Sequence, residues 1–484
     1  MNANRVDVVI VGAGPAGMAA ANVAAQRGLS VTVLDEQAAP GGQIYRAITQ
    51  TSARRLQILG PDYAAGGELA RAFAASGAKH ERGASVWQVT AERTVDYVQD
   101  GVVKSLRAGS IILCSGAMER PFPIPGWTLP GVLTAGAAQI LLKSAEVVPS
   151  QPVVLAGCGP LLYLLGWQYL RAGVPIRAIV DTTDSADYRR ALTHLGGALK
   201  GWRQLAKGLK LMRALKRAGV PFHQGATDLA LEGTDALEAI RFSVAGRVQR
   251  LPATLVLLHQ GVVPNTQVSW SLRARHRWDD AQLCWVPETD AWGELDVADI
   301  YVAGDSRGIG GAQAAAEQGR LAALEIVHRA GRIDRAMRDT LAAPVHRALR
   351  EMLHIRPFLD ALYRPKDANR IPADGVTVCR CEEVTAGQLR EFVKLGCLGP
   401  NQAKSFGRCG MGPCQGRLCG LTVTEVIADA RGVPPAEVGY YRVRPPIKPV
   451  TLAELAAAHE AALRRDDTQQ PVQAVAESHD TAAR

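Results

Sequence analysis

The sequence predicts an α/β protein with two βαβ units and a smaller, cysteine-rich module near its C-terminal end. The first βαβ pattern lies at residues 6–36 and the second at residues 153–181, each with a β-branched run, a glycine-rich turn and a helix-compatible stretch. Most of the nine cysteines gather at residues 379–419, which sets the third part apart. A chain of 484 residues with 47% hydrophobic content is long enough for two or three domains with their own cores.

The first βαβ unit has the spacing of a Rossmann-like dinucleotide-binding fingerprint. Gly12 permits a tight turn, Gly14 lets the backbone approach a pyrophosphate, and Gly17 allows the helix to pack on the strand. A second strand over residues 29–34 leads to Glu36, which is placed to accept hydrogen bonds from an adenosine ribose. We therefore expect a dinucleotide with its pyrophosphate at the N-terminus of the helix.

Two further segments favour a flavin over a nicotinamide in this unit. The run PGGQIYR at residues 40–46 supplies backbone amides, including that of Gly42, and the side-chain amide of Gln43. Much later, a strand over residues 300–302 leads to Asp305, just before a predicted helix. Asp305 is placed to bind a ribityl hydroxyl, and capping of that helix is the alternative for its carboxylate. Its pairing with the N-terminal fingerprint favours the flavin role.

The second βαβ unit departs from the fingerprint at one position. Its turn reads GCGPLL, so Leu162 stands where a small residue normally lets helix and strand approach. Asp181 retains the ribose-binding acid and disfavours a 2′-phosphate, which favours NAD over NADP. Two alternatives stay open here: a site for NAD or another adenine nucleotide, and a domain kept for its structure.

The cysteine module has the ligand spacing of a metal centre. Cys379 and Cys381 flank one residue, while Cys414 and Cys419 lie on a glycine-rich turn. Four thiolates so spaced suit an iron–sulfur cluster, and tetrahedral zinc is the alternative. The redox cofactor predicted for the first unit favours [2Fe–2S]. Cys409 is a rival to Cys414 as a ligand.

The local sequence around these cysteines supports a defined loop structure. Glycines 410, 412 and 416 leave the backbone free to direct amides at the sulfurs. Thr385 is the predicted N-cap of a helix over residues 386–395. The nucleotide-binding portion contains no Cys-x-x-Cys pair, so it lacks the dithiol that disulfide reductases place against their flavin. No substrate-oxidising pocket is visible, and no catalytic residue is assigned.

Composition excludes several other function classes. No apolar run is long enough to span a bilayer, and the start lacks a secretory signal. We therefore expect a cytoplasmic protein, with association at the inner face of the membrane through its electron acceptor as the alternative. The formal charge of +9 is spread along the chain in basic stretches such as residues 203–217, with no basic block interleaved with aromatics. A solvated basic face or an acidic protein partner is favoured over nucleic acid.

Taken together, the motifs resemble one group of flavoproteins. They are GAGPAG with Glu36, PGGQIYR, CSGAMERPFPIPGWTLPGV at residues 114–132, GCGPLL, GVVPN, VAGD, and CRCEEVT with CGMGPCQGRLCG. Over residues 6–455 the chain is similar to the A or alpha subunits of opine oxidases, the HcnB-type subunits of hydrogen cyanide synthase, and the alpha subunits of D-hydroxyproline and related amino-acid dehydrogenases. The GMGPCQGR run with the paired CRC is the specific part of this resemblance.

The resemblance implies a division of the chain. It implies an FAD-binding domain in two parts at residues 1–145 and 291–335, an inserted NAD(P)-type Rossmann domain at residues 146–290, a helical linker at residues 336–374, and an α-helical [2Fe–2S] domain like bacterioferritin-associated ferredoxin at residues 375–455. The tail at residues 456–484 has no apolar periodicity and is predicted to be disordered.

The resemblance also implies site residues. It carries Gly12, Gly14, Gly17, Glu36, Gln43 and Asp305 over to FAD, and Cys379, Cys381, Cys414 and Cys419 to the cluster. The C-x4-C spacing of the second pair is longer than the C-x2-C of free ferredoxin modules of this type, which keeps Cys409 open as a ligand.

The function so implied is electron transfer within a multi-subunit amino-acid or opine dehydrogenase. A D-amino-acid-oxidase-like flavoprotein beta subunit would oxidise the substrate, with or without a small third subunit, and pass electrons to this chain. One alternative is a self-sufficient NADH-dependent flavin oxidoreductase that uses the second unit. Another is a cysteine module that serves as a docking or iron-sensing element.

Overall fold

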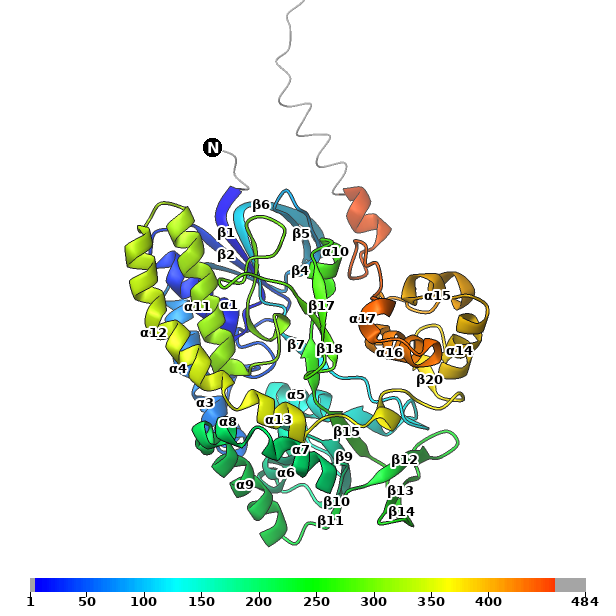
Figure 1. Ribbon diagram of the computed structural model, residues 1–484. Coiled ribbons are helices and arrows are strands. Elements are labelled where there is room, and N and C mark those ends of the chain that lie inside the picture. The colour runs from blue at the N-terminus through cyan, green and yellow to red at the C-terminus, as the bar shows by residue number, and fades with distance from the viewer. Residues whose placement is uncertain (1–4, 458–484) are drawn as a thin grey trace, which may run out of the picture.

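The computed structural model describes residues 5–457. Apart from residues 456 and 457, the predicted tail at residues 456–484 lies outside the described part of the chain. Two α/β bodies lie one above the other, and a small helical module that contains α14–α16 lies beside them (Figure 1). The predicted α/β class is confirmed.

The first body is built on a seven-stranded sheet in the order β3-β2-β1-β6-β5-β4, with β19 paired to β6. Its central strand, β1 (Arg5–Val11), runs parallel to β2 (Val31–Asp35) and β6 (Val102–Leu113). The outer strands are β3 (Lys79–Arg82), β4 (Ser85–Val89) and β5 (Thr94–Gln99). Strand β19 (Ile300–Val302), which has the bounds predicted, joins this sheet only after the chain has formed the second body.

Helices cover the first sheet and bring distant segments together. Helix α1 (Pro15–Ala25) packs along α11 (Ala312–Arg329), which in turn packs on α12 (Arg335–Leu353). Gly319 makes the α1–α11 contact close, because a Cβ at this position would collide with the backbone of Ala16. The N-terminal turn and the Asp305 segment therefore share one core.

The second body has a five-stranded sheet in the order β11-β10-β9-β15-β8. Its strands are all parallel: β8 (Val132–Thr134), β9 (Val153–Cys158), β10 (Ile176–Asp181), β11 (Phe222–Gln224) and β15 (Val256–Gln260). Strand β8 and helix α5 (Ala135–Ala145) precede residue 146, where the sequence places the start of this domain. The sheet thus takes in chain from before that boundary, because β8 pairs with a strand more than a hundred residues away.

The remaining elements connect and cover these sheets. They are α2 (Ala53–Leu59), α3 (Pro61–Ala64), α4 (Gly66–Ala74), α6 (Pro160–Ala172), α7 (Ser185–Leu192), α8 (Leu195–Lys200), α9 (Trp202–Arg217), α10 (Gln267–Ser271), α13 (Arg356–Leu362), β12 (Thr227–Glu232), β13 (Ala239–Val244), β14 (Arg247–Pro252), β17 (His276–Asp279) and β18 (Cys284–Pro287). Strand β7 (Ala117–Glu119) pairs with β16 (Val262–Pro264) between the two bodies. Among the described helices, none combines the length and the apolar character needed to cross a bilayer.

The third part holds the clustered cysteines. It contains β20 (Thr377–Cys379), β21 (Val384–Thr385), α14 (Ala386–Lys394), α15 (Pro400–Gly407), α16 (Gly420–Arg431) and α17 (Pro435–Val438). The predicted N-cap is confirmed: the Thr385 hydroxyl accepts from the amide of Gln388, whose side chain accepts from the amide of Thr385. This reciprocal capping box fixes the chain direction just after the first cysteine pair.

Candidate functional site

The first glycine-rich turn has the geometry that close backbone packing requires. Gly12 has a φ of +106°, and a Cβ on it would lie 2.5 Å from the carbonyl oxygen of Cys114. A Cβ on Gly17 would collide with the carbonyl oxygen of Gly12. Gly14 faces Gly42, where a Cβ on Gly42 would lie 2.9 Å from the Cα of Gly14. These contacts match the steric roles predicted for the turn.

Two neighbouring acids at the end of β2 have different tasks. Asp35 is buried, and its carboxylate accepts the amides of Ala13 at 2.5 Å and Gln37 at 2.7 Å. Asp35 thus holds the turn itself in place. Glu36 is exposed at its tip and accepts a hydrogen bond of 3.0 Å from the Ser85 hydroxyl. It is the Glu36 carboxylate that lies in the position of a ribose acceptor.

Glu36 also forms an ion pair with Lys448, which comes from the segment after the cysteine module. Burial raises the pKa of Glu36, but the Lys448 ammonium and the Ser85 hydroxyl outweigh burial and leave the pKa lowered. The amide of Ile447 donates to the carbonyl of Trp87 at 2.9 Å, beside this ion pair. The C-terminal segment of the third part therefore borders the first nucleotide-binding unit.

A buried lysine, which the sequence did not reveal as a site residue, lies behind Gln43. The Lys143 ammonium donates to the backbone carbonyl of Gln43 at 3.1 Å and to the Gln139 side chain at 2.8 Å. Its side chain is 2% exposed, and burial, with a smaller effect from Arg46, lowers its pKa to about 7. The available signal was a lysine four residues after a glutamine in an otherwise apolar helix, AAQILLKSA.

Asp305 lies at the end of β19 on the side of the first unit. One of its carboxylate oxygens accepts the amides of Gly310 and Gly311, each at 2.9 Å. Gly311 immediately precedes α11, so Asp305 stabilises the loop that leads into this helix. The capping role is therefore the contact present in the structure, and the ribityl role stays a prediction.

The ribose-type acid of the second unit is buried inside the protein. Asp181 is 1% exposed, and it accepts the hydroxyl of Tyr163 at 2.6 Å and the amide of Thr183 at 2.9 Å. Burial raises its pKa, although both hydrogen bonds act in the opposite direction. Leu162 is fully buried, and the close contact of α6 with β9 is made instead at Gly166, where a Cβ would lie 3.1 Å from Leu155.

The segment of residues 361–369 lies across the carboxyl ends of the second sheet. Tyr363 packs on Tyr163 with ring centroids 6.3 Å apart, and its carbonyl accepts from the Cys158 thiol at 3.6 Å. The carbonyl of Asn369 accepts from the side chain of Gln260 at 3.0 Å. The carboxyl ends of parallel strands are where open α/β sheets bind ligands. The chain's own backbone therefore occupies that position.

An ion-pair cluster holds this segment down. The Lys366 ammonium contacts Asp184 at 2.8 Å and Asp187 at 2.6 Å, just beyond the end of β10. Burial lowers the pKa of Lys366, but the two carboxylates outweigh it and leave the pKa raised. The guanidinium of Arg190 also donates to the carbonyl of Ala361 at 3.3 Å.

The structure gathers five cysteines, in a buried group of three and a more exposed pair. The sulfurs of Cys379, Cys409 and Cys419 lie within 4.8 Å of one another. Cys381 and Cys414, which are 3.8 Å apart at sulfur, form the pair. The four predicted ligands thus lie in one region, and Cys409 joins them as a full member of the buried group.

The buried sulfurs share protons. Hydrogen bonds from the thiols of Cys409 and Cys419 lower the pKa of Cys379 to about 2, and the amides of Gly410 and Glu382 act in the same direction. The pKa of Cys409 is raised to about 12, mainly because its thiol donates to Cys379. The Tyr441 hydroxyl donates to the Cys409 sulfur at 3.3 Å.

The donor set around these sulfurs fits a soft metal centre. Thiolate sulfurs with amide donors directed at them are the environment of iron–sulfur clusters, and thiolates alone also suit zinc. Gly410 and Gly412 leave room for the loop, since a Cβ on them would collide with Tyr441 and with Cys381 respectively. The outlying Cys397 is buried near the end of α14, where its thiol donates to the carbonyl of Gly399 at 3.4 Å.

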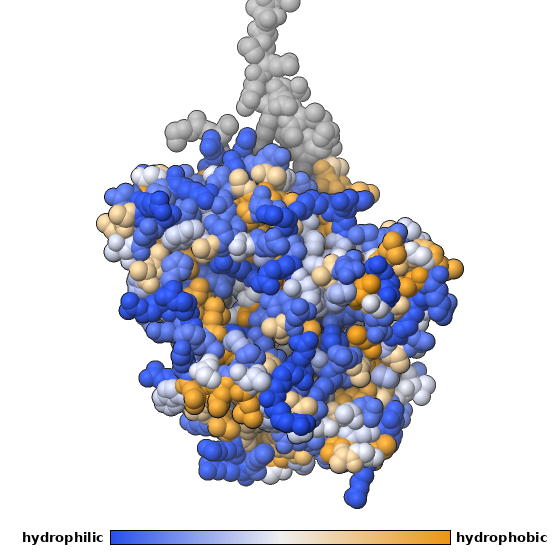
Figure 2. Space-filling model, in the orientation of Figure 1, coloured by the Kyte–Doolittle hydropathy of each residue, from blue (hydrophilic) through white to orange (hydrophobic). Residues whose placement is uncertain are grey.

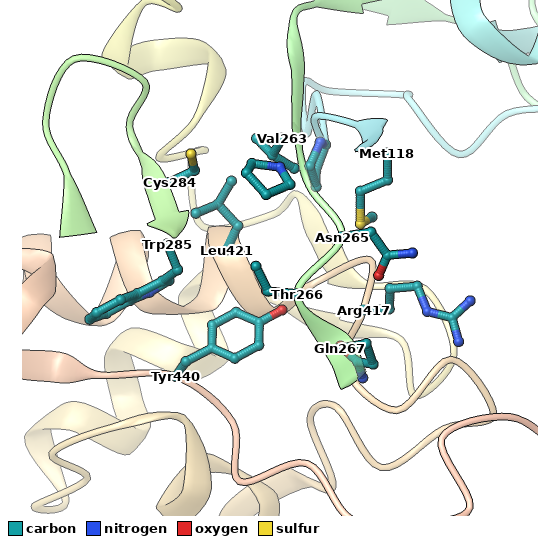
Figure 3. Close-up of a pocket in the computed structure, with 12 residues that line it drawn as sticks. Met118, Val263, Asn265, Thr266, Gln267, Cys284, Trp285, Arg417, Leu421 and Tyr440 are labelled. Carbon is teal, nitrogen blue, oxygen red and sulfur yellow. The ribbon is translucent and has the colours of Figure 1, made fainter. Parts of the chain in front are cut away.

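The third part is joined to both bodies by polar contacts. The Trp127 indole donates to the carbonyl of Thr377 at 2.8 Å, and the Gln267 side chain donates to the carbonyl of Gln415 at 2.8 Å. Arg370 forms a buried ion pair with Glu425. A hollow lies beside these contacts, with Met118 and Asn265 facing the side chains of the third part (Figure 3). Those side chains are Arg417, Leu421 and Tyr440.

Comparison with known proteins matches most of the chain. Residues 6–319 match the family model of pyridine nucleotide-disulphide oxidoreductases, and residues 377–459 match the sarcosine oxidase A3 domain. The chain is 45% identical to the A subunit of opine oxidase from Rhizobium meliloti over 459 residues, which are 93% of this chain and 87% of that protein. It is 31% identical to HcnB, a hydrogen cyanide synthase subunit of Pseudomonas protegens, over 460 residues, covering 91% of this chain and 96% of that protein.

Among solved structures, the L-proline dehydrogenase from P. horikoshii has the same fold. It superposes with a TM-score of 0.67 at 20% identity, over 93% of this chain and 79% of that chain. At this identity the likeness concerns the fold alone.

Proposed function

We propose, because the chain belongs to the pyridine nucleotide-disulphide oxidoreductase family and to the group of the opine oxidase A subunits, that it is the electron-transfer subunit of a multi-subunit amino-acid or opine dehydrogenase. One observation carries the proposal: a single chain joins a dinucleotide-type turn to a gathered set of five cysteines. The domain that holds the cysteines would be of the bacterioferritin-associated-ferredoxin type.

Each proposed cofactor has residues to hold it. Gly12, Gly14, Gly17, Glu36, Gly42, Gln43 and Asp305 would hold FAD, and Cys379, Cys381, Cys414 and Cys419 would hold a [2Fe–2S] cluster, with Cys409 as the rival ligand. A flavin exchanges electrons singly or in pairs, and such a cluster exchanges them singly. The glycine turn would let the backbone approach the pyrophosphate, and Glu36 would bind the ribose.

The oxidation of the amine would take place on a second chain. The opine oxidase relative and HcnB are both subunits by name, which supports a heteromeric assembly here. The proposed partner is a D-amino-acid-oxidase-like flavoprotein that takes electrons from the substrate and delivers them to this chain. The isolated chain would then oxidise neither opines nor cyclic amino acids.

The closed second unit argues against the alternative of a self-sufficient NADH-dependent reductase. A nicotinamide dinucleotide would have to displace residues 361–369 and the hydroxyl of Tyr163 before its ribose could reach Asp181. Each displaced hydrogen bond to a charged group costs about 1.5–3 kcal/mol. No observation favours this reductase over electron transfer from a partner protein.

The proposal is tested by anaerobic reductive titration of the purified chain, with and without its co-purifying partner, followed by visible and electron paramagnetic resonance spectroscopy. We expect flavin bleaching and a reduced [2Fe–2S] signal with an opine or cyclic amino acid only when the partner is present. Reduction by NADH alone would contradict the proposal. A colourless third part containing zinc would remove the cluster from it.

Cys414→Ala separates electron transfer from docking. Loss of turnover with an intact complex supports electron transfer, whereas loss of the complex with both cofactors retained supports a docking element. Cys397→Ala is the matched control, because Cys397 is a buried cysteine of the same domain outside the five. We expect this control to keep both turnover and complex.

A further inference from the structure

Helices α7, α8 and α9 form a strongly basic surface, here named the α7–α9 face. Residues 188–217 contain no aspartate or glutamate and nine cations, as many as the formal net charge of +9 of the whole chain. These cations, all exposed, are Arg189, Arg190, Lys200, Arg203, Lys207, Lys210, Arg213, Lys216 and Arg217. Two of them pair within the chain, Lys207 with Asp62 and Arg190 with Asp187.

The same face exposes large apolar side chains in a row. The exposed fractions are 59% for Leu192, 45% for Leu195, 64% for Leu199, 60% for Trp202 and 46% for Leu209. Leu195 and Leu199 are four residues apart in α8, and Trp202 and Leu209 are seven apart in α9, so each pair shares one helix face. A hydrophobic area bordered by hydrophilic residues is visible at the lower left of Figure 2, where α8 lies in Figure 1.

This row is distinct from the apolar stripe that packs into the core. Leu211 and Leu215 are the buried residues of α9, and Leu215 faces Gly166 of α6. Helix α9 therefore has its core contacts on one side and Trp202 and Leu209 on another. The exposed row contributes nothing to the packing of the second body.

We propose that the α7–α9 face binds the surface of an anionic lipid bilayer. An interfacial helix has this composition, with Trp and Leu entering the headgroup boundary and Lys and Arg flanking them. Four to eight cations on an amphipathic helix also attract anionic lipid headgroups. A protein partner fits less well, because lysine is depleted at protein interfaces and this face carries four lysines.

The test is flotation of the purified full-length chain with vesicles of phosphatidylcholine alone, or mixed with phosphatidylglycerol. We expect binding to the mixed vesicles only, and its loss at about 1 M NaCl, where the Debye length falls to about 3 Å. Failure to float with the mixed vesicles would overturn the proposal. Equal binding to both kinds of vesicle would also overturn it, since the charge would then have no role.

Two sets of variants tie the binding to this face. The triple variant Lys200→Gln/Lys210→Gln/Arg213→Gln and the double variant Leu199→Ser/Trp202→Ser should each weaken the vesicle partition coefficient at least about tenfold. Matched controls remove the same kinds of side chain from other surfaces: Arg335→Gln/Arg347→Gln/Arg350→Gln on α12, and Met337→Ser/Val248→Ser. The controls should bind as the unmodified chain does.

Because all these positions are exposed, every variant should keep the thermal unfolding midpoint of the unmodified chain. Controls that lose binding as strongly as the α7–α9 variants would overturn the assignment to this face. So would an acidic protein that binds the face and is released by the triple variant while the mixed vesicles bind the triple variant unchanged.

Discussion

The hydroxyl of Tyr163 donates a hydrogen bond of 2.6 Å to the carboxylate of Asp181. In a nucleotide-binding βαβ unit, an acid at this position accepts the ribose hydroxyls. Here the chain's own helix α6 supplies the hydroxyl, and Tyr363 packs against the tyrosine ring. The second unit thus keeps the fold of a nucleotide-binding domain while its ribose acceptor is already satisfied.

We therefore expect no NADH binding to the purified chain at concentrations up to ~1 mM, measured by isothermal titration calorimetry. The carboxylate of Asp181 is buried, and the segment of residues 361–369 covers the strand ends. Tyr363→Ala/Lys366→Ala should loosen this segment, seen as faster hydrogen exchange there. Tight binding of NADH to the unmodified chain would show that the segment opens readily and would contradict this expectation.

Glu36→Ala should weaken FAD binding to the apoprotein by about 10–100-fold, measured by recovery of flavin fluorescence on dilution. The ribose would lose its hydrogen bonds to the carboxylate, each worth about 1.5–3 kcal/mol for a charged acceptor. Glu92→Ala, at an exposed position on a turn of the first body, is the control and should bind FAD normally. An unchanged affinity in Glu36→Ala would exclude Glu36 from the site.

Lys448→Ala should change FAD binding and the order of the third part together. Lys448 follows the cysteine module in sequence and pairs with Glu36 in the first body, so the two parts are linked through one ion pair. Coupling between sites is reciprocal. We expect FAD to protect residues 443–450 from hydrogen exchange in the unmodified chain and to protect them less in Lys448→Ala. Protection independent of FAD would refute the link.

Cys409→Ser should lower the iron and acid-labile sulfide content of the purified chain. The Cys409 sulfur lies with those of Cys379 and Cys419 in the buried group, whereas Cys414 pairs with Cys381. Comparison with Cys414→Ser decides between the two rivals: the ligand is the one whose loss removes the cluster spectrum. Cys397→Ser should leave iron and sulfide unchanged. Full iron content in Cys409→Ser would assign the fourth position to Cys414.

Lys143 should make stability rise with pH above neutrality. Its pKa is lowered by burial from the ordinary 10.5 to about 7, so between these values the unfolded chain holds a proton that the folded chain has lost. The free energy of unfolding then rises with pH in this window, by at most about 1.4 kcal/mol per unit. Below pH 7 both states are protonated and this contribution is constant.

Chemical unfolding of Lys143→Met at several pH values between 7 and 10 checks this sign. The variant should lack the rise seen in the unmodified chain. Lys79→Met, on the exposed edge strand β3, should retain it. A slope shared by all three proteins would assign the pH dependence to other groups.

The sequence predicts the local units well. The strands at residues 6–11, 153–156 and 300–302, the basic helix over residues 203–217 and the capping residue Thr385 all agree with the structure, because periodicity, glycine sterics and capping chemistry act over a few residues. Which side chains meet across the chain is less accessible. Lys143 gives only a weak signal, and the sequence presents Cys409 as a rival ligand without showing that it belongs to the buried group.

What the sequence by itself determined is the chemistry available: a glycine turn with Glu36, a degenerate second turn with Leu162, and soft ligands at residues 379–419. Only the tertiary structure decided that β8 joins the second sheet, that residues 361–369 cover the second unit, and that Lys448 reaches Glu36. These contacts join segments far apart in the chain. Their geometry depends on how whole elements pack, and no local pattern of residues specifies that packing.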